Sequence, residues 1–122
     1  PFRRAYKISR TVVLMKMVRA IISPDKESVV GTALAKANFP VLTKWDVLVR
    51  GKQQGVQVGG QLYDELAKSM VLAVVEDDQV ELVLSTIKDD AYSSYPGDGK
   101  IFVSPVEEAI RIRTGETGSQ AL

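Results

Sequence analysis

The feature that most constrains the fold is a strand–helix–strand order that the chain uses twice. Runs of apolar, β-branched residues are typical of strands, and two of them precede segments whose apolar residues recur at helical spacing. We therefore expect an α+β, ferredoxin-like β-α-β-β-α-β sandwich, with two helices on one face of an antiparallel sheet. The strand patterns cover residues 17–22, 41–50, 70–75 and 100–103, and the helical patterns cover 24–37 and 78–87.

Capping and turn residues predict where these elements begin and end. Ser23 precedes Pro24 at the start of the first helix, and the spacing of Asp78 and Glu81 is that of a capping box. Pro105 predicts a turn, after which residues 109–113 alternate between apolar and basic side chains, as a last strand would. The sheet face without helices has to be buried, and assembly of the chain into a trimer would bury it.

Composition excludes several classes of site. The chain contains no cysteine and no histidine, which excludes disulfides, thiolate or imidazole zinc sites and Ser-His-Asp triads. Residues 1–14 hold four of the 16 basic residues and no acidic one, so the remaining 12 bases face 15 acids and residues 15–122 carry −3. That balance gives no reason to expect nucleic-acid binding.

The N-terminal residues differ from the rest of the chain in composition. We expect residues 1–14 to be a disordered leader or extension, with a basic tail that contacts a partner as the alternative, and residues 15–122 to form the domain. No apolar run is long enough for a membrane span or a signal peptide, so we expect a cytoplasmic protein without membrane insertion.

Three further segments carry candidate chemistry. Residues 51–61 contain four glycines and four glutamines and predict an exposed, mobile loop. The Gly97-Asp98-Gly99-Lys100 run predicts either a tight turn before a strand or a turn whose backbone N–H groups and lysine hold an anion. Arg111 and Arg113, two apart on the expected last strand, predict either a solvated strand face or a pair of forks for a polyphosphate.

The run from Ser93 to Glu108, followed by Arg111, Arg113, Thr114 and Gly115, resembles the C-terminal signature of the P-II nitrogen regulatory family. Residues 15–22 are similar to the first strand of that family, so the resemblance covers about residues 15 to 122. It implies a homotrimer that senses ATP/ADP and 2-oxoglutarate and performs no catalysis.

The resemblance also implies a set of site residues. ATP or ADP would bind between neighbouring subunits, and 2-oxoglutarate with Mg²⁺ would bind at the base of a long loop called the T-loop, where Gln53 would ligate the metal. The implied nucleotide residues are Ile21, Thr43, Val74, Gly97, Asp98, Gly99 and Lys100, with Arg111 and Arg113 from the adjacent chain. The implied 2-oxoglutarate residues are Lys52, Gln53, Gln54, Gly55 and Lys68.

The T-loop differs from the enterobacterial pattern of the family. It is about four residues shorter, and its tip, Gln57 to Gln61, has no tyrosine or serine to be modified. It is similar to the subgroup encoded in nitrogen-fixation operons, which implies nitrogenase as the target, an ammonium transporter as the alternative and a second P-II paralogue as a possible partner. Val56, Val58 and Leu62 are the apolar loop residues expected to contact the target.

Two departures from the family pattern affect the expected cleft. Val49 replaces a glycine near the nucleotide, and residues 91–96 replace a segment that holds an arginine and a glycine, so nucleotide affinity or the ATP/ADP preference is open. Two alternatives to a sensor also remain: an enzyme on the same fold, and an interaction module without a ligand. A nucleoside diphosphate kinase would need the histidine that this chain lacks.

Overall fold

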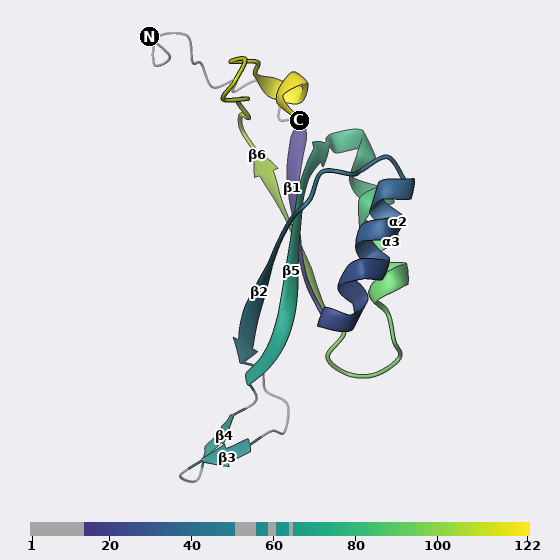
Figure 1. Ribbon diagram of the computed structural model, residues 1–122, viewed down its shortest axis with the longest axis vertical. Coiled ribbons are helices and arrows are strands. Elements are labelled where there is room, and N and C mark those ends of the chain that lie inside the picture. Colours follow the sequence, from purple (N-terminus) through teal and green to yellow (C-terminus); the bar gives the residue numbers. More distant parts are fainter. Residues whose placement is uncertain (1–13, 51–55, 59–60, 64) are drawn as a thin grey trace.

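The computed structural model describes residues 14–50, 56–58, 61–63 and 65–122, and within them it has the predicted ferredoxin-like α+β architecture. A four-stranded antiparallel sheet has the order β2-β5-β1-β6, and two helices cover one of its faces (Figure 1). The strands are β1 (Met15–Ile22), β2 (Thr43–Arg50), β5 (Glu65–Glu76) and β6 (Gly99–Val106). The helices are α2 (Glu27–Lys36) and α3 (Val80–Ala91), preceded by the 3₁₀ turns η1 (Pro24–Lys26) and η2 (Asp77–Gln79).

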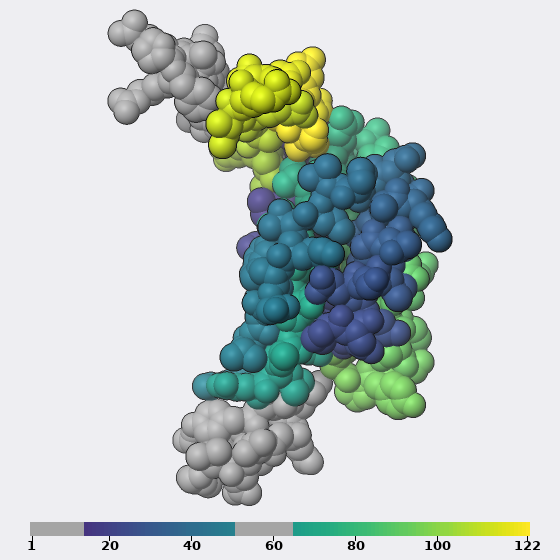
Figure 2. Space-filling model, in the orientation of Figure 1, coloured from purple at the N-terminus to yellow at the C-terminus, as the bar shows by residue number. Residues whose placement is uncertain are grey.

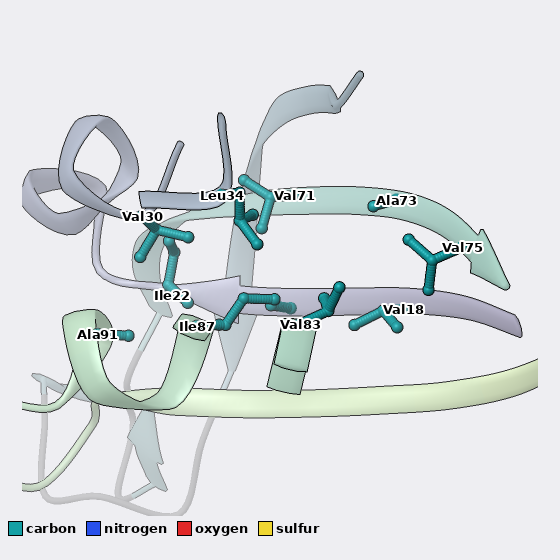
Figure 3. Close-up of a cluster of buried hydrophobic side chains, with 11 residues drawn as sticks. Val18, Ile22, Val30, Leu34, Val71, Ala73, Val75, Val83, Ile87 and Ala91 are labelled. Atoms are coloured by element: carbon teal, nitrogen blue, oxygen red, sulfur yellow. The ribbon is translucent and has the colours of Figure 1, made fainter. Parts of the chain in front are cut away.

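The core lies between the helices and one face of the sheet. Alternate residues of the two central strands are buried there, because successive side chains of a strand point to opposite faces. Figure 3 shows these side chains facing those of α2 and α3. The buried cluster contains Val18, Ala20 and Ile22 of β1, Val71, Ala73 and Val75 of β5, Val30 and Leu34 of α2, and Val83, Ile87 and Ala91 of α3.

The other face of the sheet has no cover in the single chain. The register aligns Trp45 with Met70 and Met70 with Ile21, so these three residues share that face. Phe102, opposite Arg19 in the register, is 49% exposed, and Trp45 is 41% exposed. Large apolar side chains gathered on an open sheet face mark a surface that another molecule covers.

Several predicted boundaries differ from those observed. Ser23 occupies the N-cap position of η1, as predicted, but makes no side-chain cap hydrogen bond, and Asp78 does not begin a helix because it lies inside the 3₁₀ turn η2. The predicted turn at Pro105 is wrong, because Pro105 lies within β6. β6 is at the edge of the sheet, where a residue without an N–H group breaks no ladder.

The loop between β2 and β5 contains regular structure that its glycines did not predict. Strands β3 (Val56–Val58) and β4 (Gln61–Tyr63) pair as a small antiparallel hairpin. Residues 1–13 lie outside the described part of the chain, so the expected leader remains a prediction. Among the described residues, no helix has both the length and the apolar character that a membrane crossing requires.

Candidate functional site

The glycine turn predicted as an anion site lies where the chain enters β6. Gly97 and Gly99 have φ angles of 93° and 116°, values that side chains with a Cβ rarely adopt. A methyl group at Gly99 would lie 1.8 Å from the carbonyl oxygen of Ile21. Only glycine therefore permits the turn to lie against β1, and the turn fixes the position of Lys100 next to it.

Ser93 holds the acidic residue of this turn. Its backbone N–H donates to Asp98 Oδ2 at 2.9 Å, and its hydroxyl donates to Asp98 Oδ1. These two hydrogen bonds lower the pKa of the Asp98 carboxyl below its ordinary range, and the charges of Lys26 and Lys68 lower it further. Asp98 is thus a structural anion of the turn, and Ser93 is a contributor that the sequence alone did not indicate.

Lys68 of β5 joins the turn from the base of the T-loop. Its ammonium group donates a 2.6 Å hydrogen bond to the carbonyl oxygen of Gly97. Lys68 and Lys100 both line a hollow of about 430 Å³, so two lysines border one concave surface. Such a surface attracts a ligand with several negative charges.

Arg50 and Asp98 also line this hollow, and the rest of its wall is apolar. Ile21 comes from β1, Leu66 from β5 and Phe102 from β6, and Val49 of β2 lies opposite Leu66 in the register. Leu66 and Phe102 were not predicted as site residues, although their positions two residues from Lys68 and Lys100 place each pair on one strand face. Val49 also borders the hollow, and its place near a nucleotide stays a prediction.

Arg111 and Arg113 do not reach this hollow within the chain. β6 begins at the glycine turn and spans about 23 Å before the C-terminal segment begins. Figures 1 and 2 show that segment, in yellow, beyond one end of the four-stranded sheet and the start of β5, in teal, at the opposite end of the sheet. Within one subunit, the turn with Lys100 and the two arginines predicted to hold a polyphosphate are therefore separated by the length of β6.

The prediction that Arg111 and Arg113 share a strand is wrong. Residues 112–114 form a turn, and only an isolated bridge, Ile110 to Thr117, pairs this segment. The N–H of Arg111 donates to Glu116 O at 2.9 Å, and the N–H of Gly115 donates to Arg111 O at 2.7 Å. Gly115, with a φ of 74°, allows the chain to reverse here in place of extending.

The other predicted residues lie away from the hollow or outside the described chain. Thr43 begins β2 and Val74 is near the end of β5, and neither lines the hollow. Val56, Val58 and Leu62 belong to the β3–β4 hairpin, and residues 52–55 are not described. The described residues contain no group of three acidic side chains that would hold a metal ion.

Comparisons with known proteins agree with one another. A family model described as nitrogen regulatory protein P-II matches residues 15–116. A Methanothermobacter marburgensis protein named "Nitrogen fixation nifHD region GlnB-like protein 1" is 51% identical over 104 residues, which cover 85% of this chain and 99% of that protein.

Solved structures of two further proteins have the same fold. Arabidopsis thaliana PII bound to citrate has a TM-score of 0.78 and 36% identity, covering 93% of this chain and 97% of that one. The Bacillus subtilis GlnK–ATP complex has a TM-score of 0.78 and 30% identity, covering 91% of this chain and 100% of that one.

Proposed function

The chain belongs to the nitrogen regulatory protein P-II family, and we propose that it is a cytoplasmic sensor that binds ATP or ADP at clefts between the subunits of a homotrimer. With ATP, it binds Mg²⁺ and 2-oxoglutarate at the base of the T-loop. The ligands select the arrangement of that loop and thereby regulate a target protein. The chain acts by binding and catalyses no reaction.

The observation that carries this proposal is the separation of the cationic residues. The turn with Lys100 lies at one end of β6, and Arg111 and Arg113 follow its other end. Both groups can hold one phosphate chain only when a neighbouring copy supplies the arginines. The open apolar face of the sheet gives a reason for such a neighbour to bind.

The residues present suit a nucleotide. Gly99 leaves no space for a Cβ and brings the backbone of the turn close to β1, and Lys100 supplies positive charge beside it. Ile21, Leu66 and Phe102 offer an apolar wall for the adenosine moiety. The GlnK structure with the same fold is an ATP complex, which supports this choice of ligand.

The second effector is assigned to the loop base. Lys68 pairs with the distal carboxylate of 2-oxoglutarate, while residues 52–55 surround the keto acid and Gln53 ligates Mg²⁺ next to the phosphates. The structural neighbour bound to citrate, a small carboxylate, supports a carboxylate ligand in this family. Because ATP and the keto acid meet at one metal, each raises the affinity of the other.

The name of the relative from the nifHD region favours nitrogenase as the target, and an ammonium transporter is the alternative. The loop residues Val56, Val58 and Leu62 supply the apolar contact. A ligand shifts the loop equilibrium only by its different affinities for the two loop arrangements, so the target competes with one ligand state.

Calorimetry tests the ligand assignment. MgATP should release or absorb heat on binding to the purified protein, and 2-oxoglutarate should bind only when MgATP is present. Lys100→Gln should weaken MgATP binding by at least about tenfold, because it removes a charge-assisted contact. Lys36→Gln, which removes an exposed lysine at the end of α2, is the control and should bind as the wild type does. No heat with either ligand would refute the proposal.

A further inference from the structure

Glu116 is the centre of a hydrogen-bond network in the C-terminal turn. Its carboxylate accepts from Arg111 Nη1 at 3.4 Å and from Thr114 Oγ1 at 2.9 Å through the same oxygen, Oε1. Its carbonyl accepts from the N–H of Arg111, and its own N–H donates to Thr114 Oγ1 at 3.2 Å. One residue thus joins both ends of the Arg111–Gly115 turn and also contacts the guanidinium group of Arg111.

The same network fixes how the arginines are presented. A second guanidinium nitrogen of Arg111, Nη2, donates to Leu122 O at 3.1 Å, so the group is held on two sides and keeps further N–H donors free. Arg113 and Ile112 lie beyond it in the turn, both exposed, and Ile112 is 99% exposed. The turn therefore projects from the subunit with one arginine oriented and the other at its tip.

We infer that Glu116 is a positioning residue that organises Arg111 and Arg113 for the phosphate groups of a nucleotide bound in a neighbouring subunit. This role rests on the function proposed above. An arginine that is already oriented loses less conformational freedom when it binds, so the ordered turn binds a polyphosphate more tightly than a flexible one would.

Charge alone predicts the opposite effect. Glu116 is an acid next to the arginines, and its removal makes the turn more positive, which by electrostatics alone would strengthen the binding of a polyanion. The pair with Arg111 is also about 40% exposed on both sides, so its removal should change the stability of the fold little. A loss of ATP affinity on removal of Glu116 would therefore be specific evidence for positioning.

The test compares three variants of the full-length protein by calorimetry with MgATP and with adenosine. Glu116→Ala should weaken MgATP binding by about fivefold to tenfold and leave adenosine binding unchanged, because adenosine has no phosphates. Glu116→Gln keeps an oxygen acceptor for Thr114 and Arg111 and should restore most of the affinity. Glu107→Ala removes an exposed carboxylate that has no hydrogen bond among the described residues, and it should bind MgATP at least as tightly as the wild type.

Hydrogen exchange supplies a second readout. The amides of Arg111 and Gly115 should exchange faster in the Glu116→Ala variant, while those of the sheet stay protected. Wild-type affinity for MgATP in that variant, or an equal loss for adenosine, would overturn the role of Glu116. A wild-type protein that binds no MgATP would instead refute the proposed function itself.

Discussion

The ammonium group of Lys68 lies 2.6 Å from the carbonyl oxygen of Gly97 and donates a hydrogen bond to it. This bond joins β5, which leaves the base of the T-loop, to the glycine turn at the start of β6. An ammonium group has three donors, so Lys68 can pair with a ligand while it keeps this bond. Lys68 therefore connects the end of the loop directly to the turn.

Lys68→Met should weaken the binding of 2-oxoglutarate much more than the binding of MgATP. The variant keeps the apolar stem of the side chain and loses its charge, so 2-oxoglutarate should bind at least about tenfold more weakly in the presence of MgATP. MgATP alone should bind within about threefold of the wild type, since Lys100 and the turn remain. Calorimetry measures both affinities, and Lys36→Met is the matched control. Unchanged affinity for the keto acid would show that Lys68 does not hold it.

Gly99→Ala should destabilise the fold far more than Gly115→Ala. The added methyl group at position 99 would lie 1.8 Å from Ile21 O, so the backbone of the turn or of β1 has to move, at a cost of about 2–4 kcal/mol. At position 115 nothing lies within 4 Å, and only the positive φ costs about 1–2 kcal/mol. Urea unfolding at equal subunit concentration measures the difference. Equal losses would mean that the close approach of the turn to β1 is not rigid.

Ile112→Ser should weaken the proposed trimer. Its side chain is 99% exposed in the single subunit, which is an unfavourable position for isoleucine unless a neighbour covers it. Sedimentation at low micromolar concentration should show more monomer for this variant than for the wild type. The control is Val29→Ser, which changes a half-exposed residue of α2. This helix covers the face of the sheet opposite the uncovered one. A trimer as stable as the wild type would place Ile112 outside the interface.

Ser93→Ala should raise the pKa of the Asp98 carboxyl and reduce the stability that its charge contributes at neutral pH. The hydroxyl and amide of Ser93 lower the pKa of Asp98, so the charged carboxylate stabilises the fold above the ordinary carboxyl pKa of about 3.9 and loses this effect as the pH falls through the lower folded value. Without the hydroxyl, the pKa of Asp98 should rise toward that ordinary value, so the variant should be less stable than the wild type at neutral pH, and the difference should disappear in acid. Carbon NMR of the Asp98 carboxyl follows its titration. An unchanged titration curve would contradict the assigned cause.

Strong periodicity made the fold predictable from the sequence. The apolar runs at 17–22 and 70–75 lie in the two central strands, β1 and β5, where burial on the helix face requires apolar residues. The ends of the helices and strands were harder to predict, because they depend on local hydrogen bonds. Pro105 is compatible with both a turn and an edge strand, and only the sheet order distinguishes the two.

The site was predictable in part. Glycines and a lysine indicated the turn before β6. The alternation of Arg111, Ile112 and Arg113 wrongly indicated a strand. A pattern of side chains does not report the backbone hydrogen bonds that close residues 111–116 into a turn. Phe102 and Leu66 were missed because they look like ordinary strand residues. Each shares a strand face with Lys68 or Lys100 two residues away, but only the pairing of β5 and β6 with β1 gathers these faces around one hollow.

The most direct test of the shared cleft is to mix two defective subunits. One variant carries Lys100→Ala, and the other carries Arg111→Ala together with Arg113→Ala, so neither trimer alone should bind MgATP with normal affinity. After the two are unfolded and refolded together, each mixed trimer should contain one cleft that has an intact turn from one subunit and intact arginines from the next. Random mixing should restore wild-type affinity at about one cleft in four, measured by calorimetry. If the mixture binds no more MgATP than its parents do, the turn and the arginines do not share a ligand across a subunit boundary.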